Sequence, residues 1–280
     1  MKRIILLMAL FFLAPTAFSQ TPPQQKPKDS PPGIQDNSFL IEESYNQEDG
    51  VVQHINFFMR QRNGDWVYAF TQEWPLFGLK HQLSYTIPVQ RLGSGPGGNK
   101  GLGDIALNYR YQLIGDGDAK VACSPRFTLL LPTGDEKKGR GAGGLGLQVN
   151  LPVSVVLAKK LVTHFNAGTT YTPSAKSAEG DKGSTTSYNL GQSFIWLVSP
   201  TFNVMLETVW NNVESVVGRG IKERDDSLLI SPGIRWAYNF KSGLQIVPGI
   251  AVPIGAGPSR NERGIIFYLS FEHPFKKERK

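Results

Sequence analysis

From Val51 onward the sequence alternates apolar and polar residues at every second position, in successive segments of about 9–11 residues. In residues 104–113 one set of positions is entirely apolar or aromatic, and the other carries Asn108, Arg110 and Gln112. Successive side chains of a β-strand point to opposite faces, so this period predicts strands with one apolar and one polar face. Few architectures accommodate so many strands of this kind.

A soluble β-sandwich or barrel also has alternating strands, so periodicity alone does not separate it from a membrane barrel. Strand length favours the membrane barrel, because a tilted strand needs about 9–11 residues to cross a bilayer and an ordinary strand has about 5–6. Aromatic residues such as Tyr109, Tyr171 and Trp210 lie toward strand ends. This is typical of the aromatic girdles at the two membrane interfaces.

Longer and shorter connections alternate along the chain. Longer glycine-rich or charged loops are expected at 93–101, 135–143, 177–184, 218–226 and 257–263. Tight turns are expected near 77–78, 115–118, 159–160, 199–200 and 241–243. This alternation is typical of barrels with short periplasmic turns and long external loops. The sequence therefore predicts an all-β, transmembrane, antiparallel up-and-down β-barrel of about twelve strands, with both termini periplasmic.

The remaining segments differ in composition from the strands. The expected division is a signal peptide at 1–19, a Pro-rich disordered periplasmic tail at 20–37, a segment before the barrel at 38–50, the barrel at 51–275 and a basic tail at 276–280. The signal peptide has a basic start, a short apolar run and a small-x-small cleavage site. Residues 38–46 fit a short helix or a strand equally well. A cleavable signal and a barrel predict the outer membrane of a Gram-negative bacterium.

Composition narrows the class of protein further. The chain has 30 Gly, 16 Phe, 9 Tyr and 5 Trp, which suits many strands separated by turns. The formal charge of +7 includes Lys2 and Arg3 of the predicted signal and is otherwise spread thinly, whereas a nucleic-acid binder clusters its basic residues. The single cysteine, Cys123, excludes an internal disulfide.

Three stretches, at 101–113, 125–135 and 143–154, resemble the outer-membrane proteins of the meta-pathway phenol-degradation family, which are described as transporters. The resemblance covers most of the chain beyond the predicted signal. It implies a barrel of about this size and the passage of small molecules across the outer membrane, and it carries over no substrate-binding residue. One departure is the end of the chain, where Phe275 is followed by five further residues rather than closing the sequence.

The polar faces of the strands must point into the barrel, because an Arg that faces lipid at mid-membrane costs roughly 2–4 kcal/mol. The residues predicted to line the lumen are Glu73, Asn108, Arg110, Gln112, Arg126, Asn150, Asn203, Glu207, Arg235 and Asn239. Two interpretations remain open. The charges select solutes in an open lumen, or the arginines pair with Glu73 and Glu207 and fill the interior.

An enzyme is a further possibility, since an outer-membrane phospholipase has a barrel of this size. The nearest Ser–His pair is His81 and Ser84, which lie three residues apart on a strand and so point to opposite faces. His54, His164 and His273 have no serine with an oxyanion-hole signature nearby in the sequence. No metal-ligand spacing is present, and the glycine-rich loops open no helix that could bind phosphate. The sequence therefore predicts neither an enzyme nor a cofactor.

The predicted function is a channel or transporter for passive passage of small solutes, hydrophobic or aromatic solutes among them. The alternatives are a non-conducting barrel with a structural or binding role and, third, a phospholipase-like enzyme. The expected partners are outer-membrane lipid and lipopolysaccharide, the barrel-assembly machinery during biogenesis and an unidentified solute, with no nucleic acid. Loop residues suited to lipopolysaccharide phosphates are Lys137, Lys138, Arg140, Arg219 and Arg263, and the alternative, which the sequence favours, is a rim of basic residues in contact with water only.

Overall fold

The fold was analysed in a computed structural model, which describes residues 38–93 and 98–275. The predicted signal peptide at 1–19, the predicted tail at 20–37 and the predicted basic tail at 276–280 lie outside the described residues.

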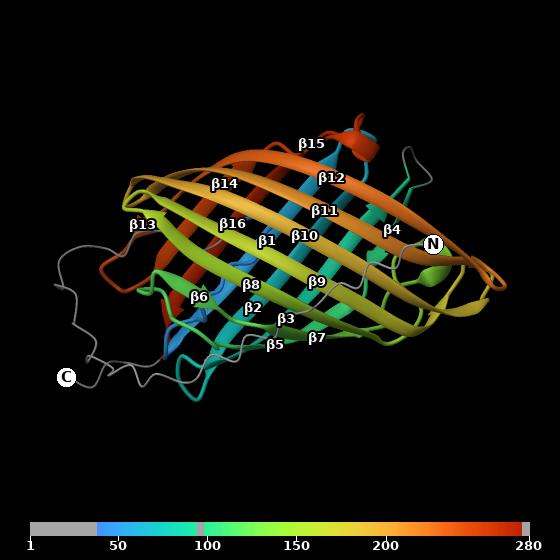
Figure 1. Ribbon diagram of the computed structural model, residues 1–280, viewed down its shortest axis with the longest axis horizontal. Coiled ribbons are helices and arrows are strands. Elements are labelled where there is room, and N and C mark those ends of the chain that lie inside the picture. Colours follow the sequence, from blue (N-terminus) through green and yellow to red (C-terminus); the bar gives the residue numbers. More distant parts are fainter. Residues whose placement is uncertain (1–37, 94–97, 276–280) are drawn as a thin grey trace, which may run out of the picture. The chain divides into compact units, whose positions relative to one another are not determined.

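Antiparallel strands make up most of the described chain (Figure 1). They are β1 (Val51–Gln61), β2 (Trp66–Leu76), β3 (His81–Leu92), β4 (Asn99–Leu102), β5 (Ile105–Tyr111), β6 (Val121–Cys123), β7 (Arg126–Leu131), β8 (Gly146–Ala158), β9 (Leu161–Lys176), β10 (Lys182–Ser199), β11 (Phe202–Gly218), β12 (Ile221–Trp236), β13 (Tyr238–Asn239), β14 (Gln245–Ala251), β15 (Ile254–Gly255) and β16 (Gly264–Pro274). Two short 3-10 helices, η1 (Glu136–Lys138) and η2 (Gly257–Ser259), lie in connections. In the part of the chain that the structure describes, no helix is long and apolar enough to span a membrane.

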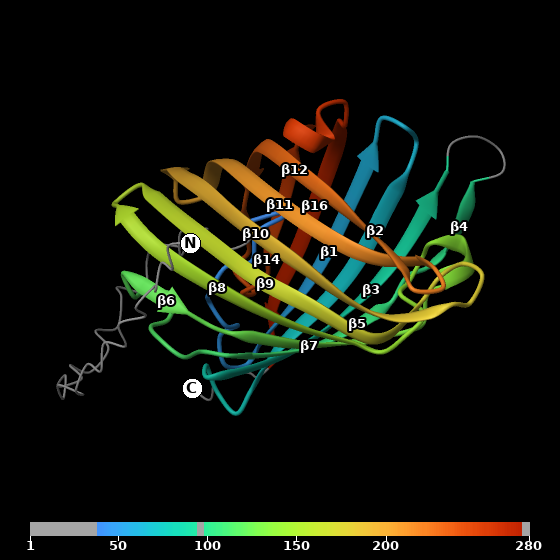
Figure 2. The same ribbon diagram turned by 45° about the vertical axis from the view of Figure 1, so that its right-hand side comes forward.

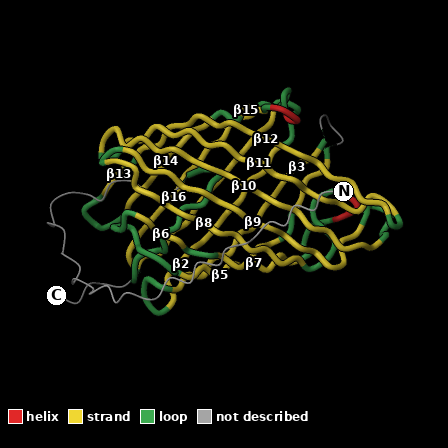
Figure 3. The backbone as a smooth tube through the Cα atoms, in the orientation of Figure 1, coloured by secondary structure: helices red, strands yellow, loops and turns green. Residues whose placement is uncertain are grey.

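The sheet closes on itself. Each strand pairs with its neighbours in the sequence, and β16 pairs with β1 over the full length of both strands, from Val51 opposite Pro274 to Gln61 opposite Gly264. The short elements continue neighbouring strands, β4 with β5, β6 with β7, β13 with β12 and β15 with β14. The result is a closed barrel of twelve antiparallel strands, as the continuous strand network in Figure 3 shows. The predicted fold class is confirmed.

Two of the predicted long loops are wrong. Residues 177–184 reduce to a five-residue turn before β10, and most of 218–226 belongs to β12, which is joined to β11 by a tight turn at 219–220. Strands β9 to β12 have 16–18 residues, against 11 in β1, and they extend beyond the other strands at one end of the barrel (Figure 2). A strand extension in water can be charged on both faces, so its sequence resembles a loop. Here Glu214 of β11 pairs with Arg224 of β12 at 2.9 Å.

The outer surface of the barrel is apolar, and its interior holds the polar side chains together with a smaller apolar cluster that includes Val162, Ile195 and Met205. On β11 the inward residues Asn203 and Glu207 are fully buried, whereas the outward residues Val204 and Leu206 are 42% and 44% exposed. On β10, Trp196 is 59% exposed. A soluble barrel buries its apolar face, so this reversed arrangement places the outer surface in lipid. The outward apolar belt therefore defines a membrane protein.

The outward apolar belt leads to a prediction about the stability of the protein in lipid. Leu206→Arg places a charge against the acyl chains and is expected to lower the free energy of unfolding in lipid vesicles by about 2–4 kcal/mol. Ile221→Arg is the matched control, because Ile221 is an exposed apolar residue next to the tight turn between β11 and β12, at the end of the strand extension that lies beyond the bilayer. Urea titrations of the folded fraction would measure both. Equal losses in the two variants would contradict the position of the belt.

Candidate functional site: a lumen occupied by residues 38–47

Residues 38–47, which we call the plug segment, run through the interior of the barrel. The sequence left helix and strand open for residues 38–46, and the structure shows neither. The backbone instead bonds to wall side chains: the Ser44 N–H donates to Ser154 Oγ at 2.8 Å and the Gln47 N–H to Gln82 Oε1 at 2.6 Å. Because the wall supplies the hydrogen-bond partners, the segment needs no regular secondary structure of its own.

The first anchor of the plug segment is Glu207 of β11. Its Oε1 atom accepts three successive backbone N–H groups, from Phe39 at 3.0 Å, Leu40 at 2.8 Å and Ile41 at 3.1 Å. Hydrogen bonds to a charged acceptor are roughly twice as strong as neutral ones. A single buried carboxylate therefore holds one end of the plug segment against the wall.

Glycines in the wall make room for the apolar side chains of the plug segment. A Cβ atom at Gly249 would lie 2.5 Å from the ring of Phe39, and one at Gly233 would lie 2.8 Å from it. At Gly191 a Cβ would collide with the Cδ1 of Ile41. A larger residue at any of these three positions, on β14, β12 and β10, would push the plug segment away from the wall. The wall is thus shaped to fit the segment.

The second anchor is Arg110 of β5, which is 3% exposed. Its guanidinium donates to the carbonyl oxygens of Glu43 at 3.1 Å and Tyr45 at 2.6 Å, and to Asn46 Oδ1 at 2.9 Å. Its Nη2 lies 4.0 Å from Oε2 of Glu73, which is on β2 in the barrel wall. Since a guanidinium has five donors in a fixed planar arrangement, Arg110 can bind several groups of the plug segment at once.

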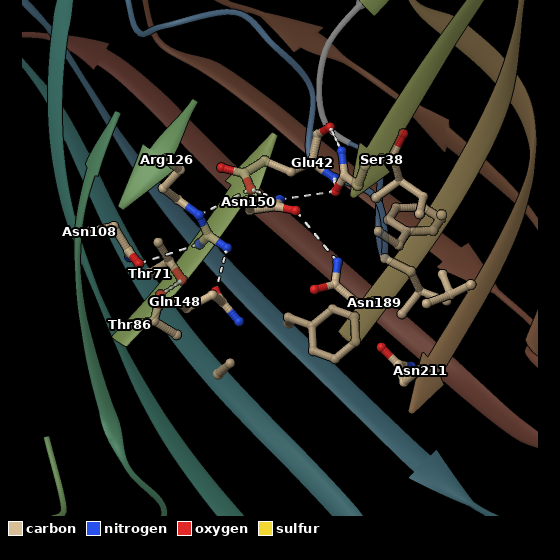
Figure 4. Close-up of a pocket in the computed structure, with 18 of the residues that line it drawn as sticks. Ser38, Glu42, Thr71, Thr86, Asn108, Arg126, Gln148, Asn150, Asn189 and Asn211 are labelled. Carbon is tan, nitrogen blue, oxygen red and sulfur yellow. Dashed lines mark hydrogen bonds and ion pairs between the residues drawn. The ribbon is translucent and has the colours of Figure 1, made fainter. Parts of the chain in front are cut away.

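Between the anchors, Glu42 of the plug segment reaches the wall at Arg126 and Asn150 (Figure 4). Glu42 Oε2 lies 3.1 Å from Arg126 Nε and accepts a hydrogen bond from Asn150 Nδ2 at 2.7 Å. Glu42 Oε1 lies 3.4 Å from Arg110 Nη1. Both carboxylate oxygens are therefore bound by side chains of the wall.

A cavity of about 520 Å³ remains beside the plug segment. Its polar lining includes the amides Asn108, Gln148, Asn150, Asn189 and Asn211. Its apolar lining includes Ile55, Phe57, Val209 and the ring of Tyr268. The volume falls within the range of small-molecule sites, about 300–1,000 Å³. The cavity therefore offers an amphipathic space inside the lumen.

The structure places the predicted lumen-lining residues in four groups. Glu73, Asn108, Arg110, Arg126 and Asn150 line the cavity. Gln112 and Glu207 bind the plug segment, while Asn203 and Arg235 are fully buried in the wall. Asn239 is exposed at the end of the barrel and accepts a hydrogen bond from Gln245.

The sequence analysis considered pairing of the arginines with Glu73 and Glu207 as the filling of the lumen. In the structure Arg126 pairs with Glu42, and Arg110 lies closer to Glu42 than to Glu73. The plug segment thus supplies the principal carboxylate. Sequence reasoning missed this role of residues 38–47. A signal was available, because glycines at inward positions of neighbouring strands indicate the close approach of another segment.

Two histidines, His81 and His164, lie beside a hydroxyl group. His81 bonds to Tyr109 Oη at 2.7 Å on the outer face, while Ser84 is buried inside and bonds to Asn108, so the two point to opposite faces as predicted. His164 does contact a serine, which its sequence neighbours did not reveal: Ser154 Oγ lies 2.7 Å from its Nδ1 across the β8–β9 hairpin. Ser154 also accepts the N–H of Ser44, so it holds the plug segment.

Arg140, predicted as a lipopolysaccharide contact, is 8% exposed. Its Nη1 donates to Asn99 Oδ1 at 2.5 Å and its Nη2 lies 3.4 Å from Asp135 Oδ2. The residue therefore joins the connection between β7 and β8 to the start of β4.

The closed barrel, its outward apolar belt and its polar interior define an outer-membrane β-barrel with the fold of bacterial porins and channels. The chain belongs to the family described as "MetA-pathway of phenol degradation", which matches residues 29–259. It is similar to an outer membrane channel from Pseudomonas putida F1, with 11% identity, 89% of this chain and 99% of that chain covered and a TM-score of 0.60. It is also similar to the NanC porin, with 8% identity, coverage of 80% and 100% and a TM-score of 0.51. A search of curated proteins found no significant match.

Proposed function

We propose that the protein is a channel for the passive passage of small solutes across the outer membrane, and that residues 38–47 close it in the conformation described here. The observation that carries the proposal is the fit between the plug segment and the lumen. The segment is not part of the barrel ladder, and its contacts are with inward side chains. Its removal would free the polar groups of the wall that it now binds, in an interior that also holds apolar side chains such as Ile195, Met205 and Ile266.

The composition of the barrel wall also favours a passage for solutes over an interior filled by packed side chains. Inward residues around the cavity include amides and hydroxyls, such as Asn189, Asn211 and Thr170, which hydrogen-bond to water as readily as to protein. A barrel of twelve strands is wider than the eight-stranded barrels that side chains alone can fill. A lumen of this width needs an additional segment to close it, and the plug segment has that position.

Deletion of residues 38–47 tests the proposal. The purified deletion variant in planar lipid bilayers is expected to conduct ions continuously, because the lumen loses the segment that crosses it. The unaltered protein is expected to show rare openings. A folded barrel is verified by its heat-dependent migration on denaturing gels. A folded deletion variant without conductance would contradict the channel and favour the alternative of a structural or binding barrel.

A further inference from the structure

We propose that Arg110, Arg126 and Asn150 form a binding site for the carboxylate of a small organic acid, and that Glu42 occupies this site in the closed conformation. The inference deepens the proposed function, on which its relevance to transport rests, by naming the class of solute. We call these three residues the carboxylate site.

Glu42 occupies the carboxylate site in this structure, and its contacts show how the site binds a carboxylate. Glu42 Oε1 accepts a hydrogen bond from Arg110 Nη1 of β5 at 3.4 Å. Glu42 Oε2 accepts one from Asn150 Nδ2 of β8 and forms an ion pair with Arg126 Nε of β7, as Figure 4 shows. Guanidinium groups and amides are the donors that suit a planar carboxylate. A solute carboxylate in the same place would find the same donors.

Two of the three donors, Arg126 and Asn150, are held in position by the wall. Arg110 binds the wall at Gln82 Oε1, at 3.1 Å, in addition to its bonds to the plug segment. The Arg126 guanidinium donates to Asn108 Oδ1 at 3.3 Å and to Gln148 Oε1 at 2.9 Å. The side chain of Asn150 is 3% exposed and lies within 3.5 Å of the amide of Asn189. Since these contacts do not involve Glu42, they can orient the donors after Glu42 leaves, and preorganised donors bind a ligand with a smaller entropic cost.

The cavity beside the carboxylate site indicates the size and polarity of the rest of the solute. Ile55, Phe57 and Tyr268 line it on β1 and β16, facing the same space as Arg126 and Asn150. A ligand that fits both parts has a carboxylate at one end and a compact aromatic or aliphatic body at the other. Inorganic anions would use the donors alone and leave the apolar wall in contact with water.

Charge makes occupation by Glu42 and by a solute mutually exclusive. Glu42, Glu43 and Glu73 already lie within 4.0 Å of Arg110, and Arg126 is the second cation of the cluster. A fourth carboxylate would add repulsion without a further cation. A bound organic acid must therefore displace Glu42, which weakens the hold of the wall on the plug segment.

Equilibrium dialysis of radiolabelled benzoate against the purified protein in detergent tests the inference without requiring conductance. The unaltered protein is expected to bind benzoate weakly, because Glu42 competes. Glu42→Gln removes one charged competitor and is expected to tighten binding about tenfold. Glu48→Gln is the matched control, since Glu48 lies in the same part of the chain but is exposed outside the cavity, and it is expected to bind as the unaltered protein does.

The donor side is tested in the Glu42→Gln background. Adding Arg126→Gln is expected to abolish the gain, and Arg126→Lys, which keeps the charge, is expected to retain part of it. Benzyl alcohol, which has the same ring without a charge, is expected not to displace the label. Unchanged affinity in Glu42→Gln, or equal displacement by benzyl alcohol, would overturn the carboxylate site. A deletion variant that fails to conduct would overturn the channel and leave this binding result standing.

Discussion

Glu207→Gln is expected to open the channel. The neutral amide can still accept the N–H groups of Phe39, Leu40 and Ile41, but three charge-assisted hydrogen bonds become neutral ones. A loss of about 1 kcal/mol per bond weakens attachment of the plug segment by about 3 kcal/mol, or roughly a hundredfold in its equilibrium constant. Planar-bilayer recordings should show a corresponding rise in the fraction of time spent open.

Glu214→Gln is the control for this prediction. Glu214 lies on the same strand but belongs to the external extension, where it pairs with Lys222 and Arg224. We expect its replacement to leave the open fraction unchanged. If Glu207→Gln also behaves as the unaltered protein while the variant lacking residues 38–47 conducts, the three N–H bonds are not what holds the plug segment.

Arg110→Met is expected to destabilise the protein by about 3–5 kcal/mol, because it leaves the carboxylates of Glu42, Glu43 and Glu73 together without their shared cation. Release of the plug segment takes Glu42 and Glu43 into water and relieves part of this loss. The variant is therefore expected both to unfold at lower urea concentration in lipid vesicles and to conduct more than the unaltered protein.

Two further variants separate these effects. In a protein without residues 38–47, Arg110→Met leaves only Glu73 uncompensated, and the loss of stability is expected to be smaller. Adding Glu73→Gln to Arg110→Met is expected to restore part of the stability, since the buried charge is removed. Equal losses with and without the plug segment would show that Arg110 stabilises the wall alone and does not bind the plug segment.

The barrel was predictable because lipid and water impose opposite requirements on the two faces of every strand. The alternation in residues 104–113 predicted which side chains point inward, and Asn108 and Arg110 have the predicted face in the structure. The boundary between strand and loop was harder to predict at 218–226. Outside the bilayer a strand no longer needs an apolar face, so its composition does not differ from that of a loop.

The sequence by itself determined the architecture, the membrane-facing surface and the inward polar residues, since each follows from local periodicity. Only the tertiary structure decided what fills the lumen. The contact of Glu42 with Arg126 joins residues 84 positions apart in the sequence, and that of Phe39 with Glu207 spans 168. Residues 38–47 have no strong preference for helix or strand. Their conformation depends on hydrogen bonds to side chains that only the closed barrel brings together.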